Sequence, residues 1–152
     1  MLKKNYNTEF PEDEDDSNYM NHKQLEYFRQ KLLKWRKVLQ KESEELDTEL
    51  LQPQADADLT DMATREHNIV LILNTRKRND ALIIEINKAI QRIDDGLYGY
   101  CEETGEKIGI ARLEANPITL YSIEEQERRE KQQKLYSNDQ ENDYSNNFLN
   151  DN

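Results

Sequence analysis

The chain has 152 residues, the usual size of one domain. Hydrophobic residues make up 35% of it and charged residues another 35%, which leaves too little apolar material for a compact globule with a thick core. The formal net charge is -11, from 21 basic and 32 acidic residues. Such a surface repels phosphate backbones, so we expect no autonomous DNA binding.

Cysteine content and hydropathy further limit the class of protein that the sequence can encode. Cys101 is the only cysteine in the sequence, so no intramolecular disulfide is expected. The N-terminal stretch reads MLKKNYNTEFPEDEDD and lacks the apolar core of a signal peptide. No apolar run approaches the ~20 residues that span a membrane. We expect a cytoplasmic monomer that makes no contact with membranes.

The chain begins with a polar segment, 1–20, that contains the acidic run EDEDD at 12–16 and is typical of a disordered tail. A helical pattern then begins near His22, with apolar side chains at spacings of three, four and seven residues. This heptad seam has one polar core position, near 42–43. Its apolar members are Leu25, Phe28, Leu32, Trp35, Leu39, Leu46 and Leu50.

A second helical pattern starts after Asp61, once Pro53 has ended the first. Arg76 and Asn79 interrupt its seam, as a hinge, a partner contact or a polar core position, and the residues do not decide among these. Two seams joined by a short polar break predict an antiparallel coiled-coil hairpin over 21–97. A compact bundle would need a third long amphipathic helix. The apolar seam members are Ile69, Ile72, Ile83, Ile86, Ile90, Ile93 and Leu97.

The backbone chemistry changes after the hairpin. All four glycines of the chain fall between Gly96 and Gly109, and glycine supplies positive φ and close backbone approach. We therefore expect a small, tightly turned module over 98–121. Ile108 and Ile110 alternate with polar neighbours, as in a short strand. The apolar residues expected to pack this module are Leu97, Tyr98, Tyr100, Ile108, Ile110 and Leu113.

The last helix is predicted over 122–136, and it opens with a capping box. Ser122 would accept from the backbone N–H of Glu125, while Glu125 reaches back to the N–H of Ser122. The Asn-rich segment 137–152 is of low complexity, and we expect it to be disordered. The predicted fold is mainly α: a long antiparallel coiled-coil hairpin, a small globular head and a C-terminal helix.

The break between the two hairpin helices is acidic. It holds Asp56, Asp58 and Asp61 within the expected hairpin tip near 53–63. Aspartates before a helix cap its free N–H groups and complement its dipole. A Ca²⁺ loop is not indicated, because the glycine and the closing glutamate of an EF-hand are missing. An arm of ~25 residues would hold these acids roughly 40 Å from the base, which favours a group that reaches a partner.

Several short motifs run in order across about residues 19–135: YMN at 19–21, QL at 24–25, FR at 28–29, WR at 35–36, D-x-x-D-x-A at 58–63 and IGIARLEA at 108–115. In these motifs the chain resembles the DksA family, transcription factors that act through the secondary channel of RNA polymerase. The resemblance implies a hairpin that enters the polymerase and a zinc-finger-like head. It also implies that Asp58, Asp61 and Ala63 are the tip residues that act near the polymerase active centre.

Family members commonly hold a structural Zn²⁺ with two cysteine pairs. The four matching positions here are Cys101, Thr104, Ser122 and Glu125. Tetrahedral zinc needs four good donors, and this set provides one thiolate, one carboxylate and two poor ligands. No histidine lies near in the sequence. We expect a degenerate, zinc-free head that resembles the Cys-poor branch of the family.

The mechanism that the resemblance implies is regulation without catalysis by this chain. The tip would bias a conformational equilibrium of the polymerase and destabilise promoter open complexes, which inhibits ribosomal RNA promoters in the stringent response.

The alarmone guanosine tetraphosphate (ppGpp) assists many members of the family through basic side chains. The matching positions here are on or near Glu85, Asn116 and Gln126, and none is basic. We expect ppGpp to be a weak or differently placed partner. Arg78 and Arg112 stand where the family has arginine. They are candidate polymerase contacts or, equally, solvated surface charges.

Two other classes stay open. A Gre-type cleavage factor would use paired tip acids to hold a second Mg²⁺ and stimulate cleavage of backtracked RNA, although the head and the D-x-x-D-x-A spacing match the DksA pattern better. A coiled-coil adaptor with no polymerase role would not need a Gly-rich head. A backtracked-RNA cleavage assay separates the first class, and a pull-down with polymerase core separates the second.

Overall fold

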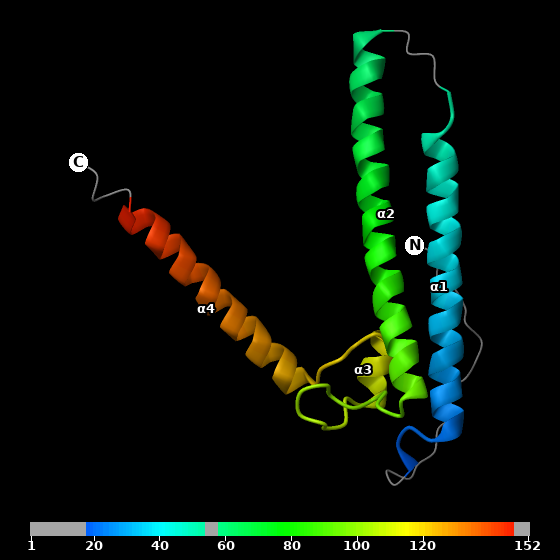
Figure 1. Ribbon diagram of the computed structural model, residues 1–152, viewed down its shortest axis with the longest axis vertical. Helices are drawn as coiled ribbons and strands as arrows, with labels where there is room; N and C mark the ends of the chain where they lie inside the picture. The colour runs from blue at the N-terminus through cyan, green and yellow to red at the C-terminus, as the bar shows by residue number, and fades with distance from the viewer. Residues whose placement is uncertain (1–17, 54–57, 148–152) are drawn as a thin grey trace. The chain divides into compact units, whose positions relative to one another are not determined.

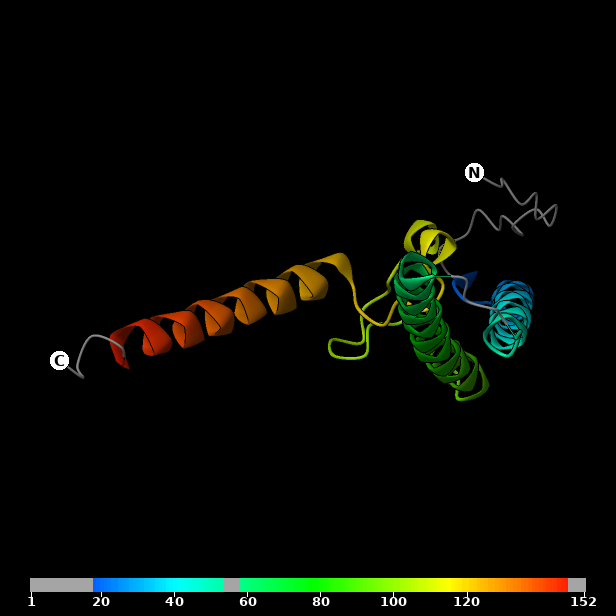
Figure 2. The same ribbon diagram turned by 90° about the horizontal axis from the view of Figure 1, so that it is seen from above.

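The computed structural model describes residues 18–53 and 58–147, and these are mainly helical, as predicted. The chain divides into two compact units, Met1–Tyr98 and Gly99–Asn152. In the first unit, helix α1 spans His22–Leu50 and helix α2 spans Leu59–Asp94. The two helices lie side by side in opposite directions (Figure 1, Figure 2), which confirms the predicted hairpin. None of the described helices is long and apolar enough to cross a bilayer.

Local hydrogen bonds set the start of α1. The side chain of Asn21 accepts from the N–H of Gln24 at 2.9 Å, and Gln24 Oε1 accepts from the N–H of Met20 at 2.8 Å. These contacts satisfy N–H groups that a helix start leaves free. Residues 1–17 of the expected acidic tail lie outside the described residues, whereas 18–20 form the turn that leads into α1.

The core of the hairpin is concentrated at its base. Each fully buried apolar side chain there contributes ~1.5–3 kcal/mol. Nearer the tip, the seam residues Leu46, Leu50, Ile69 and Ile72 are only half-buried. The hairpin therefore thins toward the tip. The buried apolar residues of this core are Phe28, Leu32 and Leu39 from α1, and Ile86, Ala89 and Ile93 from α2.

Three polar pairs between α1 and α2 define the register of the hairpin. Arg29 pairs with Asp94, Arg36 Nη1 donates to Asn87 Oδ1 at 2.7 Å, and Arg76 pairs with Asp47. In all three pairs, the α1 residue lies as many positions further along its helix as the α2 residue lies earlier along its own, so the three pairs belong to one register. In this register the end of α1 at Leu50 lies opposite residue 73, so the first part of α2 projects past α1 (Figure 1). At 1.5 Å per residue, this projection is roughly 20 Å long.

The interrupted part of the seam is a polar core layer. Asn79 is 1% exposed, and its Nδ2 donates to Glu42 Oε2 at 3.0 Å. Ser43 is buried at the polar position expected near 42–43, which confirms that expectation. Of the interpretations left open for Asn79, the structure therefore supports the polar core position. Arg76 is half-exposed and engaged with Asp47.

One residue predicted to lie in the core, at the end of α2, is exposed in the structure. Leu97 was expected in the seam and in the core of the head, but it is 54% exposed. The reason is that α2 ends at Asp94 and the chain turns at Gly96, where φ is +72°. Tyr98 is buried instead, and its ring centroid lies 5.5 Å from that of Phe28.

The second unit begins with a tight turn. The N–H of Cys101 donates to the carbonyl of Glu106 at 2.7 Å, and the N–H of Ile108 donates to that of Gly99 at 2.8 Å. Tyr100 and Lys107 form an isolated antiparallel bridge. The strand expected over Ile108 and Ile110 is wrong, because Gly109 at φ +98° turns the chain into the short helix α3, Ile110–Ala115.

Helix α4 spans Ile123–Asn147 and is longer than predicted. We expected this helix to end at residue 136 and the chain to be disordered from residue 137. Instead, the helix continues to Asn147. After Pro117 the sequence contains no further proline or glycine, so no residue type that breaks helices ends the pattern. Residues 148–152 lie outside the described residues.

Candidate functional site

The start of α2 carries the predicted tip residues. The Asp58 carboxylate accepts from the N–H of Asp61 at 2.9 Å, and the carbonyl of Asp58 accepts from the N–H of Met62 at 3.2 Å. Asp58 is therefore the N-cap of α2, as the capping argument predicted. Asp56 lies outside the described residues.

The cap leaves a second carboxylate exposed at the distal end of the hairpin. Asp61 sits in the first turn of α2, where the positive end of the helix dipole favours an acid. Asp58, Asp61 and Ala63 are all exposed. Because the start of α2 projects past α1, these three residues lie at the distal end of the hairpin's helices.

Apolar side chains accompany the acids at the tip. Leu59 is 81% exposed and Met62 is also exposed. A small cleft lies a few residues behind them, between the end of α1 and the first turns of α2. It is lined by Glu49, Leu50, Gln52, Arg65, Asn68, Ile69 and Ile72. The projecting end of α2 thus offers carboxylate and apolar groups together, which suits contact with a protein surface.

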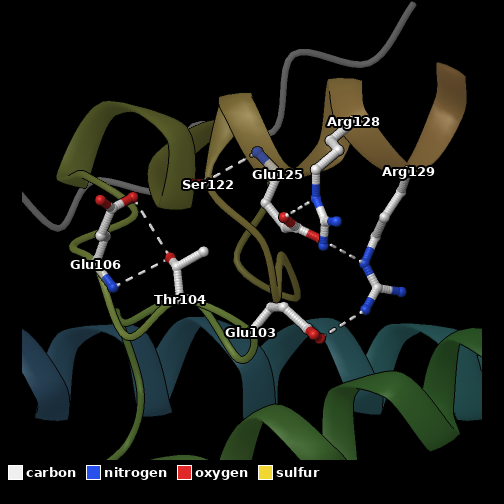
Figure 3. A network of polar contacts seen from close by, with 7 residues as sticks. All are labelled: Glu103, Thr104, Glu106, Ser122, Glu125, Arg128 and Arg129. Carbon is white, nitrogen blue, oxygen red and sulfur yellow. Dashed lines mark hydrogen bonds and ion pairs between the residues drawn. The ribbon is translucent and has the colours of Figure 1, made fainter. Parts of the chain in front are cut away.

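The head contains the four positions at which the resemblance implies a zinc site: Cys101, Thr104, Ser122 and Glu125. Cys101 is buried at the tight turn, and Ser122 and Glu125 are buried at the start of α4. The N–H of Glu125 donates to Ser122 Oγ at 3.4 Å, so the first half of the predicted capping box is present. The Thr104 hydroxyl accepts from the N–H of Glu106 at 3.3 Å, as Figure 3 shows.

The environment of Cys101 favours the thiolate. Burial raises its pKa, but hydrogen bonds from the Thr104 side chain and from the backbone of Ser122, Thr104 and Glu103 lower it. The net result is a pKa that falls from the ordinary 9.0 to about 7. Backbone groups of both the tight turn and the start of α4 therefore point toward one sulfur atom.

The second half of the capping box is replaced by ion pairs. The Glu125 carboxylate, in a residue that is 4% exposed, accepts from Arg128 Nε and Nη2, both at 2.8 Å, and from Arg129 Nε at 3.1 Å (Figure 3). The Arg128 guanidinium, helped by Arg129, lowers the pKa of the Glu125 carboxyl. The side chain expected to turn back to Ser122 turns along α4 instead, because bidentate guanidinium contacts are the stronger option.

Arg129 joins α4 to the turn. Its Nη2 donates to Glu103 Oε2 at 3.0 Å, and its guanidinium lies 4.0 Å from the centre of the Tyr121 ring. The sequence analysis did not predict these contacts of Glu125 with Arg128 and Arg129. The signal was the i, i+3 and i, i+4 spacing of Glu125 to Arg128 and Arg129.

The two candidate arginine contacts differ in the structure. Arg112 Nε donates to the carbonyl of Tyr121 at 3.1 Å, so it holds the head together. Arg78 is exposed on α2. Glu85, on or near which the resemblance implies a basic residue, accepts from Lys88 Nζ at 2.9 Å. Arg78 remains the more accessible of the two candidate contacts.

The fold and the site together define the class of protein. It is a coiled-coil hairpin with a capped acidic tip, followed by a small turned module and a helix. Two family models match the chain. The N-terminal domain of the DnaK suppressor protein DksA matches residues 24–93, and the prokaryotic dksA/traR C4-type zinc finger matches residues 96–131.

Similar proteins agree with these matches. The RNA polymerase-binding transcription factor DksA of Caulobacter vibrioides (strain NA1000 / CB15N) is 47% identical over 126 residues, 82% of this chain and 89% of that protein. The protein of the same name from Escherichia coli (strain K12) is 38% identical over 107 residues, 70% and 71% of the two chains. The solved structure of transcription factor DksA2 from Pseudomonas aeruginosa has a TM-score of 0.72 at 36% identity, covering 79% of this chain and 93% of that one. The chain belongs to the DksA family.

The zinc site that the second family model implies does not fit the residues present. Cys101 is the only cysteine, and Glu125 is already bound by two guanidinium groups. In the described ranges, no group of three or more His, Cys, Asp or Glu side chains is placed to hold a metal ion. Thr104 and Ser122 are poor zinc ligands.

We predict that Glu125→Gln loosens the head. The change leaves Arg128 and Arg129 without their shared carboxylate, and the buried amide pairs less strongly with them. Amides of residues 101–106 should exchange hydrogen clearly faster than in the wild type. Glu124→Gln is the matched control, since Glu124 is the exposed neighbour in the same helical turn. Equal exchange in both variants would show that the ion pairs do not hold the turn.

We also predict that stability rises between about pH 7 and pH 9. The folded-state pKa of Cys101, about 7, lies below the ordinary 9.0, so in this window the unfolded chain binds more protons than the folded chain. The free energy of unfolding in urea, under reducing conditions, should be larger at pH 9 than at pH 7. Cys101→Ser should remove this difference. Thiolate absorbance should titrate near pH 7 in the folded protein, and titration near 9 would refute the argument.

Proposed function

We propose that this chain binds RNA polymerase directly and regulates transcription, with the tip of its hairpin as the acting group. The observation that carries the proposal is the start of α2, where Asp58 caps the helix and Asp61 is left exposed on a segment that projects past α1. Relatives 47% and 38% identical over most of their length are named RNA polymerase-binding transcription factors, which supports the same partner here.

The proposed mechanism is a population shift without catalysis by this chain. The hairpin enters the secondary channel, and Asp58, Asp61 and Ala63 meet mobile elements near the active centre. A tip that binds one polymerase state better by ~1.4 kcal/mol shifts the balance of states about tenfold. Promoters with short-lived open complexes, such as those for ribosomal RNA, are then inhibited, as in a stringent response. The small side chain of Ala63 lets the helix approach closely.

A weak contribution of ppGpp belongs to the same proposal. Glu85 and its partner Lys88 offer a neutralised pair rather than a free cation, and Asn116 and Gln126 carry no charge. A tetra-anion gains little from such a surface. Inhibition by this chain should therefore depend little on the alarmone.

The proposed head works without zinc. Glu125, Arg128 and Arg129 join α4 to the turn through Glu103. Backbone groups around the Cys101 sulfur supply the hydrogen bonds that a metal-bound thiolate would also accept. The head then keeps its shape when metal is withheld.

The transcription prediction concerns Asp61→Asn. The change removes the exposed charge but keeps the Asp58 cap, so the folded hairpin should persist. Inhibition of a ribosomal RNA promoter in vitro should fall by about tenfold, the effect of ~1.4 kcal/mol of differential binding, while binding to polymerase core stays within about twofold. Asp80→Asn, an exposed aspartate in the middle of α2, is the control and should inhibit like the wild type.

The same assay tests the rest of the proposal. Each protein is assayed with and without ppGpp, and on a backtracked complex for RNA cleavage. Wild type that binds polymerase but inhibits no better than Asp61→Asn would remove the tip from the mechanism. Wild type that stimulates cleavage would favour a Gre-type function. Wild type that does not bind polymerase would favour an adaptor.

The zinc prediction concerns metal content. Elemental analysis of the purified protein should find far less than one zinc per chain, and a chelator should not change its melting temperature. Replacing Thr104→Cys, Ser122→Cys and Glu125→Cys together should create a four-thiolate site that binds about one zinc per chain. Stoichiometric zinc in the wild type would refute the proposal, and a triple variant that binds none would show that these positions do not converge.

A further inference from the structure

Charge is distributed unevenly along α1. Residues 22–41 contain seven of the 21 Lys and Arg residues of the chain but only one of the 32 Asp and Glu residues. Residues 42–50 contain five acids and no base. One helix of an acidic protein is therefore basic over its first two thirds and acidic over its last third.

Helix stability does not explain this distribution. The dipole of a helix favours acids in the first turn and bases in the last. The first turn of α1 contains no acid and its last turn no base. The charges run against the dipole, so an effect other than helix stability accounts for them.

The arginines and lysines of this segment lie on different sides of the helix. Arg29 and Arg36 engage Asp94 and Asn87 across the hairpin. The lysines Lys23, Lys34, Lys37 and Lys41 are exposed and recur at helical spacing opposite the buried stripe of Phe28, Leu32 and Leu39. We call these four residues the lysine face. The arginines build the hairpin, whereas the lysine face points to solvent.

The lysine face is largely unneutralised. Within the described part of the chain, Lys34 and Lys37 have no ion-pair partner. Lys41 reaches Glu45 only at 3.6 Å, with its side chain 76% exposed, and such a pair contributes little.

A solvated face that serves only solubility usually mixes both signs. Helix α4 has that pattern, with Lys131 beside Glu127, and Arg128 and Arg129 sharing Glu125. The single sign on α1 points to a partner instead.

The charge distribution favours an acidic protein surface over a nucleic acid as the partner. Lysine is a compact, hydrated charge that steers association, whereas phosphate recognition more often uses the planar fork of arginine. The lysine face is roughly 27 Å long, and the five acids of 42–50 begin one residue past it. A continuous phosphate backbone would meet those acids, but a discrete acidic patch would not.

We propose that the lysine face docks on an acidic surface of RNA polymerase and steers the hairpin into place. This inference rests on the proposed function, since it assigns a contact surface to the same complex. It adds to the tip a second contact on the base half of α1, with binding that depends on salt.

The test compares two double variants of the full chain. Lys34→Gln with Lys37→Gln removes two charges of the lysine face, and Lys88→Gln with Lys131→Gln removes two lysines outside that face, each next to an acid of its own helix, as a control. Association with polymerase core is measured at several salt concentrations. The lysine-face variant should associate about three- to tenfold more slowly at low salt, the control should stay within about twofold of wild type, and the difference should vanish near about 0.5 M salt.

Each outcome decides the matter. Equal association of both variants, or a loss that does not depend on salt, overturns the inference while leaving the proposed function intact. Wild type that fails to bind polymerase overturns the proposed function and the inference with it. A lysine-face variant that loses binding to single-stranded RNA or duplex DNA, with its polymerase association unchanged, assigns the face to nucleic acid instead.

Discussion

The register between α1 and α2 decides where the acidic end of the hairpin lies. The apolar seam alone would tolerate a shift by one heptad, because its pattern repeats every seven residues. The pairs Arg29–Asp94 and Asp47–Arg76 and the hydrogen bond from the buried Asn79 to Glu42 form together in one register only. A one-heptad shift would move the start of α2 by roughly 10 Å. The polar breaks in the seam therefore position Asp58 and Asp61, even though they lie far from them.

One position in the head shows why the residues present do not fit the zinc site that the second family model implies. A structural zinc ion demands four ligands at fixed distances. Here the carboxylate of Glu125 is occupied by Arg128 and Arg129, and the same contacts that join α4 to Glu103 withdraw it as a ligand. A guanidinium network tolerates small changes in geometry that a tetrahedral metal does not. Hydrogen bonds from the turn and from Ser122 reach the Cys101 sulfur, so this turn stabilises a thiolate without a metal ligand set around it.

Local patterns predicted what depends on neighbours in sequence. Heptads gave the hairpin, and the Asp58 cap followed from its place before α2. Features that depend on tertiary contacts or on one backbone angle escaped prediction. The projection of α2 past α1 follows from the register, and the exposure of Leu97 follows from the turn at Gly96. The pattern of Ile108 and Ile110 was too short to separate a strand from the start of α3. The partners of Glu125 were visible in the helical spacing, but the capping box offered a competing use for the same carboxylate.

Charge and shape act together along the hairpin. Residues 22–41 of α1 are basic, whereas 42–50 and the start of α2 are acidic. An acidic surface that attracts the base half of α1 repels the tip half, so the two halves cannot exchange places in a complex. In the proposed complex with polymerase, this polarity selects the orientation in which the tip points away from the acidic docking surface. The lysine face then governs how the hairpin arrives, and the capped end of α2 governs what it does after arrival. Arrival depends on long-range charge and is sensitive to salt, whereas the action of Asp61 depends on contacts inside a confined site and is much less so.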